Sequence, residues 1–333
     1  MRKTTLDNSV VVITGASSGI GRATALEFAK EGANIVLAAR SKRALREVAA
    51  ECKEHAVEAL VVPTDVSDED EVKNLATSAV DEFGRIDIWV NNAGVGLYAG
   101  FEESPPDDFR QVLETNLFGC IYGARAALRQ FREQGTGVMI NVSSQIVLGG
   151  LPYSSAYGIS KHGIRALGDH LRQELVDTDI HVCTVFPSST DTAFFQHSAN
   201  YTGREVKPLG GVSDPVTVAQ EIIKLSLEPK PEVVISKSGY LMALGHAIAP
   251  RAYDRVIALK TERDHFKKSA AAHTKGNLYA PVKPNSITGG WRRSSVPKKI
   301  SAVAMAGVGT SAALAYWYNR RRRSRPEDWR TAA

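Results

Sequence analysis

The chain has 333 residues, 43% of them hydrophobic and 23% charged, which is enough for one large or two ordinary globular domains. This composition excludes collagen-like, coiled-coil and wholly disordered chains. Residues 291–333 hold ten Lys or Arg and two Asp or Glu, a net charge of +8, so residues 1–290 carry −3 of the total of +5. A mildly acidic body argues against nucleic-acid binding.

Cysteine and histidine are sparse. The three cysteines, Cys52, Cys120 and Cys183, are too few and too scattered for a disulfide framework or a zinc cluster, and the eight histidines show no ligand spacing. We therefore predict no metal site and a reducing compartment. No apolar run precedes the first strand, so the sequence shows no signal peptide and a cytoplasmic location is expected for the main domain.

Strand and helix patterns alternate along the chain. Short β-branched apolar runs predict strands at 10–14, 34–39, 59–63, 86–91, 138–143, 180–186 and 232–236. Amphipathic spacing predicts helices at 19–30, 42–54, 68–83, 107–132, 156–175 and 215–227. Apolar strands separated by helices favour an α/β fold, with a single doubly wound parallel sheet (a Rossmann fold) and helices on both faces.

Composition divides the chain into three parts. Residues 1–260 hold the alternating pattern and form the predicted Rossmann domain. Residues 261–299, rich in Lys, Ala, Pro, Gly and Ser, are typical of a linker. Residues 300–333 combine an apolar segment with a basic tail.

A glycine-rich loop joins the first strand to the first helix. Glycines at such a junction let the backbone approach a pyrophosphate, which binds the exposed N–H groups at the positive end of the helix. The spacing is G-x-x-x-G-x-G, and a plain tight turn is the alternative. The predicted cofactor-binding residues of the loop are Gly15, Ser17, Ser18, Gly19, Ile20 and Gly21.

Arg40 follows the second strand, where a dinucleotide-binding protein that prefers NAD places an acid for the ribose 2′-hydroxyl. An arginine there favours a 2′-phosphate, so NADP(H) is the preferred cofactor and NAD(H) the alternative. A solvated residue at the start of a helix is the other interpretation of Arg40.

Tyr157 and Lys161 lie four residues apart on a predicted helix, which places both side chains on one face. An ammonium beside a phenol favours the phenolate and lowers the pKa of the tyrosine, which can then exchange a proton with a substrate oxygen. The alternative, without a catalytic role, is an exposed tyrosine whose ring packs against the aliphatic part of the lysine side chain. Ser143 and Ser144 end one strand upstream, and Asn91 and Asn92 end another, at the edge where a parallel sheet binds its ligand.

Four motifs together carry a resemblance to a known family: T-G-x-x-x-G-x-G at 14–21, N-N-A-G at 91–94, N-V-S-S at 141–144 and Y-x-x-x-K at 157–161. In order and spacing they resemble the classical short-chain dehydrogenase/reductase family over about residues 6–236. The C-terminal extension is unusual for that family.

The resemblance implies roles for individual residues. Tyr157 matches the general acid/base, Lys161 the residue that lowers its pKa and holds the nicotinamide ribose, and Ser144 the residue that orients the substrate oxygen. Asn116 matches the asparagine whose backbone carbonyl holds a water next to the lysine. The further cofactor contacts implied are Asp65 and Val66 at the adenine, then Asn92, Ala93, Gly94, Pro187, Thr190 and Thr192.

The loop after the sixth strand departs from the family pattern. Ser188 stands where the family has a glycine after Pro187. Serine tolerates a positive φ poorly, so we expect this loop to follow a different path.

The loops after the fourth to sixth strands are mostly apolar and aromatic, and the first two of them bring no Arg or Lys to the site. An apolar secondary alcohol or carbonyl compound therefore fits better than a carboxylate or phosphate. The residues expected to line the pocket are Val95, Leu97, Tyr98, Phe101, Ile146, Val147, Leu148, Tyr153, Phe194 and Phe195.

Residues 300–318 are uncharged and are followed by four arginines at 320–323. The length and the basic flank suit a membrane anchor at 300–323, but many of these residues are Ala, Gly, Ser or Thr. An interfacial or oligomer-packing helix and a disordered tail are the alternatives.

The sequence thus predicts an NADP-dependent oxidoreductase that interconverts a secondary alcohol and a ketone or aldehyde. The competing hypotheses are a nucleotide-binding scaffold without catalysis and a membrane-tethered regulatory protein. The resemblance also implies a homo-oligomer, a dimer or tetramer, with the helices at 107–132 and 156–175 as its interface.

Overall fold

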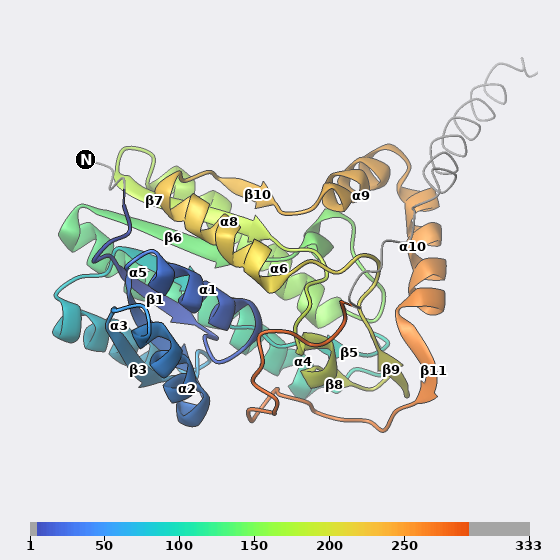
Figure 1. The fold of residues 1–333 in the computed structure, drawn as a ribbon. Coiled ribbons are helices and arrows are strands. Elements are labelled where there is room, and N and C mark those ends of the chain that lie inside the picture. Colours follow the sequence, from blue (N-terminus) through green and yellow to red (C-terminus); the bar gives the residue numbers. More distant parts are fainter. Residues whose placement is uncertain (1–4, 293–333) are drawn as a thin grey trace, which may run out of the picture. The chain divides into compact units, whose positions relative to one another are not determined.

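The computed structural model describes residues 5–292, and its centre is a parallel sheet in the order β10-β7-β6-β4-β1-β2-β3 (Figure 1). All neighbouring strands of this sheet pair in parallel. This order confirms the predicted doubly wound Rossmann fold. Its strands are β1 (Val10–Thr14), β2 (Asn34–Ala39), β3 (Ala59–Pro63), β4 (Ile88–Asn91), β6 (Thr136–Val142), β7 (Asp179–Phe186) and β10 (Glu232–Val234).

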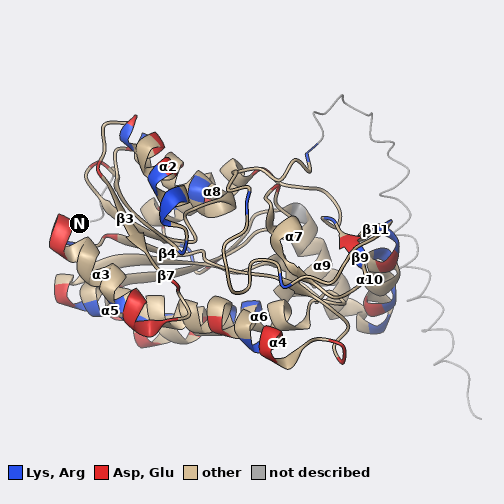
Figure 2. Ribbon diagram, turned by 90° about the horizontal axis from the view of Figure 1, so that it is seen from below, with Lys and Arg blue, Asp and Glu red and all other residues tan. Residues whose placement is uncertain are grey.

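Helices cover both faces of the sheet, and each face has its own apolar core. On one face pack α1 (Gly19–Lys30), α2 (Lys42–Lys53) and α8 (Pro215–Leu227). On the other pack α3 (Glu69–Phe83), α5 (Gly119–Gln134) and α6 (Ser155–Glu174). Figure 2 shows the charged residues concentrated on the helices while the strands between them are largely uncharged, as burial on both faces requires.

The long helix predicted at 107–132 is interrupted. It consists of α4 (Pro106–Leu113), a π-helical turn at Glu114–Phe118 and then α5. A single π turn inserts an extra residue while apolar periodicity continues on either side, so the sequence pattern does not reveal it. The turn contains Asn116.

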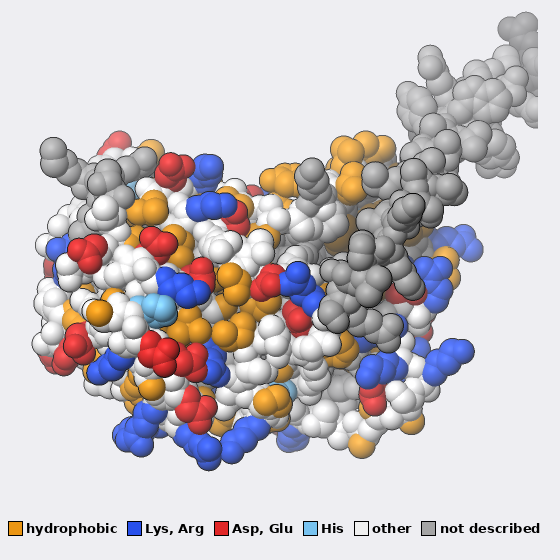
Figure 3. All heavy atoms as spheres, in the orientation of Figure 1, with side chains coloured by type: hydrophobic (Ala, Val, Ile, Leu, Met, Phe, Trp, Pro, Cys, Tyr) orange, Lys and Arg blue, Asp and Glu red, His pale blue; other side chains and the backbone are white. Residues whose placement is uncertain are grey.

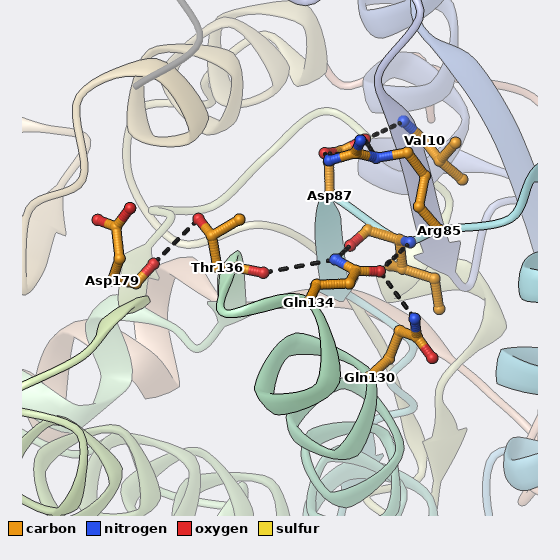
Figure 4. Close-up of polar contacts among 8 residues, drawn as sticks. Val10, Arg85, Asp87, Gln130, Gln134, Thr136 and Asp179 are labelled. Carbon is orange, nitrogen blue, oxygen red and sulfur yellow. Dashed lines mark hydrogen bonds and ion pairs between the residues drawn. The ribbon is translucent and has the colours of Figure 1, made fainter. Parts of the chain in front are cut away.

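Polar side chains join the amino-terminal ends of the strands, on the side away from the glycine loop (Figure 4). The Gln134 amide donates to the carbonyl of Ile86 at 2.8 Å and accepts from the Ile86 N–H at 2.9 Å. Asp87 accepts from the Val10 N–H at 2.9 Å and pairs with Arg85. These contacts provide hydrogen-bond partners for backbone groups at the amino-terminal ends of the strands, where the hydrogen bonds between strands begin.

The compact unit continues to Trp291, well past the boundary predicted at residue 260. Helices α9 (Lys237–Ile248) and α10 (Pro250–Asp264) precede β11 (Phe266–Ala270), which pairs antiparallel with β9 (Arg204–Val206). Residues 261–291 are therefore not the expected linker, because their backbone and side chains are hydrogen-bonded to the part of the chain that contains the sheet. Such long-range pairing leaves no periodic signal in a segment rich in Lys, Pro and Gly.

Short elements lie near the carboxyl ends of the sheet. β5 (Leu97–Tyr98) pairs with β8 (Ala199–Asn200), a 3₁₀ turn spans Gln145–Leu148, and α7 covers Phe194–His197. The predicted apolar segment and basic tail at 300–333 lie outside the described residues. Within residues 5–292, no helix combines the length and apolarity that crossing a membrane requires.

Candidate active site

The strand order reverses between β1 and β4, which is where a doubly wound sheet binds its ligand. Thr14, at the end of β1, is buried there. Its hydroxyl accepts from the N–H groups of Asn92 (3.0 Å) and Ala93 (3.1 Å) and donates to the carbonyl of Val90 at 3.3 Å. The side-chain amide of Asn92 in turn donates to the Thr14 carbonyl at 2.9 Å. The N-N-A-G segment is thus fixed against the glycine loop.

Two features of the glycine loop require glycine. Gly15 has φ +67°, in the left-handed region, and a Cβ on Gly21 would lie 2.3 Å from the carbonyl oxygen of Gly15. The loop leads directly into α1, and the Ser18 side chain makes no capping bond to the helix. First-turn N–H groups that no side chain caps suit an anion, as the motif predicts.

Arg40 is not the solvated residue of the alternative interpretation. Its Nη1 and Nη2 donate to the carbonyls of Leu278 (3.0 Å) and Asn277 (2.6 Å). Burial lowers the pKa of Arg40 and the nearby charge of Asp65 opposes that shift. Asp65 forms no ion pair with Arg40 in the described structure, and its Oδ1 accepts instead from the N–H and hydroxyl of Ser67.

Tyr157 and Ser144 meet at the carboxyl end of the sheet. Ser144 follows β6 and caps the 3₁₀ turn by accepting from the Ile146 N–H at 3.2 Å. Burial raises the pKa of Tyr157 to about 12, and a hydrogen bond with the Ser144 hydroxyl works against that rise. The expected lowering of this pKa is therefore absent in the free protein, because burial disfavours the phenolate more than its neighbours stabilise it.

Lys161 lies one turn further along α6, with its Nζ 5.5 Å from the Tyr157 ring centroid. It is only 4% exposed, and its Nζ donates to the carbonyl of Val142 at 2.8 Å. Burial lowers the pKa of Lys161 to about 8. The two side chains share one face, as their spacing predicts.

Asn116 belongs to the π-helical turn and is buried. Its Nδ2 donates to the Val95 carbonyl and the Ser160 hydroxyl, both at 3.0 Å, and its Oδ1 accepts from the Val95 N–H at 2.8 Å. A cavity of about 10 Å³ beside Asn116, lined also by Thr14 and Cys120, is close to the size of one water. The side chain thus ties α4–α5 to the loop after β4, with Gly94 between Asn116 and Lys161.

The loop after β7 holds Thr190 and Thr192, both buried. Ser188 does not adopt a positive φ, and its hydroxyl bonds that of Ser213 at 2.7 Å. Thr192 faces the glycine loop: its Cγ2 lies 3.1 Å from the position of a Cβ on Gly19. The structure therefore places Thr192 opposite the loop predicted to bind the pyrophosphate.

Residues 276–291, which we call the strap, run along the same site and were not among the predicted site residues. The strap reaches Arg40 through Asn277 and Leu278, and the Gly19 N–H donates to the carbonyl of Ser286 at 3.0 Å. The indole N–H of Trp291 donates to the Thr192 carbonyl at 3.0 Å. The composition of the strap gave no signal of these contacts.

The predicted pocket residues fall into small apolar clusters around the site. Phe194 packs against Tyr157 with ring centroids 5.3 Å apart, and Tyr98 and Phe195 contact the His265 ring. Phe101 is 69% exposed. The remaining predicted pocket residues contribute to three packed clusters.

Among residues 5–292, no three His, Cys, Asp or Glu side chains are grouped so that they could hold a metal ion. The expectation of a site without metal stays a prediction.

Comparison with known proteins agrees with this geometry. The family model for short chain dehydrogenases matches residues 9–202. An uncharacterised oxidoreductase of Bacillus subtilis, YxnA, is 30% identical over 321 residues, covering 94% of this chain and 90% of its own. The 3-dehydrosphinganine reductase of Danio rerio is 32% identical over 246 residues, covering 72% of this chain and 74% of its own.

Solved structures of dehydrogenases also have folds similar to that of this chain. An alcohol dehydrogenase from Thermococcus sibiricus, complexed with 5-hydroxy-NADP, superposes with a TM-score of 0.61 at 29% identity, covering 68% of this chain and 96% of that one. A short-chain dehydrogenase/reductase from Burkholderia phymatum in complex with NAD has a TM-score of 0.68 at 24% identity, covering 74% and 95%, and supports the fold alone. The chain therefore belongs to the short-chain dehydrogenase/reductase family of oxidoreductases.

Proposed function

We propose that the protein is an NADP(H)-dependent oxidoreductase that interconverts an apolar secondary alcohol and the corresponding carbonyl compound. The observation that carries the proposal is the meeting of Ser144, Tyr157 and Lys161 at the carboxyl end of the sheet, beside the glycine loop. Ser144 hydrogen-bonds the phenol of Tyr157, and Lys161 is buried next to its ring.

In this site each side chain has a distinct task. The Ser144 hydroxyl orients the substrate oxygen, and the Tyr157 phenol exchanges a proton with it. Because the pKa of Tyr157 is about 12 in the free protein, its phenol is protonated at neutral pH and ready to act as an acid, which suits carbonyl reduction. The nicotinamide, when bound, supplies or accepts the hydride. Lys161 places an ammonium beside the phenol and stabilises the phenolate that proton transfer leaves.

Arg40 supports NADP(H) over NAD(H). The residues around the glycine loop fit a dinucleotide, since the Ser18 side chain does not cap α1 and Arg40 lies at the end of the neighbouring strand β2. Of the first N–H groups of α1, that of Gly19 donates to the carbonyl of Ser286 in the strap. The binding of 5-hydroxy-NADP by the Thermococcus relative is in line with this preference. NAD(H) is the alternative that the titration below tests.

The aromatic side chains at the site support an apolar substrate. Phe194 lies against the Tyr157 ring, so an apolar group bound next to the phenol has an apolar neighbour. The Danio relative is named as a reductase of 3-dehydrosphinganine, which is consistent with carbonyl reduction.

The test is a fluorescence titration of NADPH and NADH on the wild type and on Arg40→Asp. We expect the wild type to bind NADPH more tightly and the variant to reverse the order, because an aspartate repels a 2′-phosphate and accepts from a 2′-hydroxyl. Binding of neither nucleotide by the wild type would refute the proposal. A scaffold without catalysis is the second hypothesis, and it predicts nucleotide binding without turnover of any carbonyl compound.

We also propose a homo-oligomer that uses the faces of α4–α5 and α6. Phe118 and Ile159 lie on these elements and are exposed, so association would remove apolar surface from water. Sedimentation equilibrium tests this: a dimer or tetramer is expected, and a monomer at micromolar concentration contradicts it.

Contact with an anionic membrane surface is a further part of the proposal, together with the predicted anchor at 300–323. Hydrophobic side chains gather over α9 (Figure 3), where Tyr240, Leu241, Leu244 and Ile248 are exposed. Exposed Arg251 and Arg255 follow on α10. Apolar and basic surface side by side suits anionic lipid. Pelleting of the full chain with phosphatidylserine vesicles is expected; equal recovery in the supernatant with and without vesicles would contradict it.

A further inference from the structure

We propose that the beginning of the strap, Gly276–Leu278, positions Arg40 for the 2′-phosphate of NADP(H). This inference rests on the proposed function and extends it, because it assigns cofactor selectivity to a segment far from the glycine loop in sequence.

The guanidinium of Arg40 is held at two points by uncharged acceptors. Nη1 donates to the Leu278 carbonyl at 3.0 Å and Nη2 to the Asn277 carbonyl at 2.6 Å. A guanidinium has five N–H donors in a rigid plane, so these bonds fix its orientation and leave three donors for another acceptor.

The character of the acceptors matters as much as their position. A carboxylate partner would neutralise Arg40 and compete with a phosphate, whereas a backbone carbonyl orients the side chain and leaves its charge in place. In the described structure Arg40 has no carboxylate within ion-pair distance, and the nearby Asp65 directs its Oδ1 to Ser67. Arg40 is therefore oriented but not neutralised, which is the state that suits capture of a phosphate.

The two carbonyls are themselves fixed to the body of the protein. The Leu278 side chain is fully buried in a core cluster, and the Asn277 N–H donates to the His197 carbonyl at 2.8 Å. The next residue, Tyr279, donates its hydroxyl to Asp108 at 2.8 Å. Arg40 thus receives a rigid support, and a support of this kind reduces the entropy that a long side chain loses when it binds a ligand.

Gly276 offers a way to move the support without touching Arg40. It has φ +50°, and a Cβ there would lie 2.2 Å from the His197 carbonyl oxygen. Gly276→Ala must therefore displace the chain immediately before Asn277. The matched control is Gly135→Ala: Gly135 also has a positive φ, +77°, but a Cβ there meets nothing within 4 Å, and it lies at the end of α5.

The experiment measures the dissociation constants of NADPH and NADH for the wild type, both glycine variants and Arg40→Ala. For Gly276→Ala we expect NADPH affinity to fall about tenfold, which is about 1.4 kcal/mol, with NADH affinity nearly unchanged. Gly135→Ala should keep the wild-type ratio of the two constants. In the Arg40→Ala background, Gly276→Ala should change that ratio no further, since the strap acts through Arg40.

Three results would overturn the inference: equal weakening of both nucleotides by Gly276→Ala, no change in either, or an undiminished effect in the Arg40→Ala background. If Gly276→Ala does not fold, as judged by thermal unfolding, Leu278→Val loosens the same anchor with a smaller change, and the same expectations apply. Failure of the proposed function itself is distinct, because the wild type would then bind neither nucleotide.

Discussion

Replacing Thr14 by valine keeps the shape of a side chain that is only 2% exposed and removes its hydroxyl. That hydroxyl accepts from two backbone N–H groups, at Asn92 and Ala93, and donates to one carbonyl. A buried polar group left without a partner costs about 1–3 kcal/mol. Because Asn92 and Ala93 are only partly buried, we take the lower half of the range for each and expect Thr14→Val to lose about 2–4 kcal/mol of unfolding free energy.

The matched control is Thr14→Ser, which keeps the hydroxyl and loses one methyl group, for a cost of about 1 kcal/mol. Urea unfolding at neutral pH measures both variants, and an unchanged m-value shows that the comparison concerns stability alone. Since the same bonds fix the N-N-A-G segment, Thr14→Val should also weaken NADPH binding. Equal stability of the valine and serine variants would refute the interpretation that this hydroxyl holds the two loops together.

Three other predictions concern Gly21 in the glycine loop, Lys161 on α6 and His265, the residue after α10. Gly21→Ala should abolish nucleotide binding in a titration, because its Cβ would lie 2.3 Å from the Gly15 carbonyl; wild-type affinity would contradict this. Lys161→Met should lower kcat about 100-fold or more in a steady-state assay with NADPH, with a smaller loss in Lys161→Arg, and equal rates would contradict it. Burial lowers the pKa of His265 to about 4, so between pH 6.5 and 4 the unfolded chain binds a proton that the folded protein does not. As the pH is lowered through that window, the free energy of unfolding measured in urea should fall by about 1.4 kcal/mol per pH unit. His265→Phe should make the unfolding free energy less dependent on pH.

The Rossmann sheet was predictable because its signal is local: apolar strands and amphipathic helices alternate, and each strand ends near a motif. The meeting of Tyr157, Lys161 and Ser144 follows from helical spacing and from the rule that parallel strands end at one edge. The π turn around Asn116 was not predictable, since the apolar pattern on either side of it is that of a continuous helix.

Other features depend on burial and on partners far away in the sequence. The sequence places Lys161 beside Tyr157 but does not reveal that burial raises the pKa of the phenol in the free protein. Arg40 could be located from its strand, whereas its acceptors at Asn277 and Leu278 lie more than 230 residues away. The strap has the composition of a linker, and its hydrogen bonds and the burial of Leu278 distinguish it from one.

The central claim is that the protein reduces a carbonyl compound: when NADPH is bound, its nicotinamide supplies the hydride to the carbonyl carbon, and the Tyr157 phenol donates a proton to the carbonyl oxygen. The direct measurement incubates the protein with NADPH that carries two deuterium atoms at nicotinamide C4, so that either face transfers deuterium, and with a panel of apolar ketones, and follows the alcohol products by mass spectrometry. We expect the alcohol formed by the wild type to be one mass unit heavier than the alcohol formed with unlabelled NADPH. Tyr157→Phe keeps the ring and removes the hydroxyl that donates the proton, so the alcohol should form at least about a hundredfold more slowly. Wild-type protein that binds NADPH but transfers no deuterium to any ketone, or a Tyr157→Phe variant as fast as the wild type, would contradict the account.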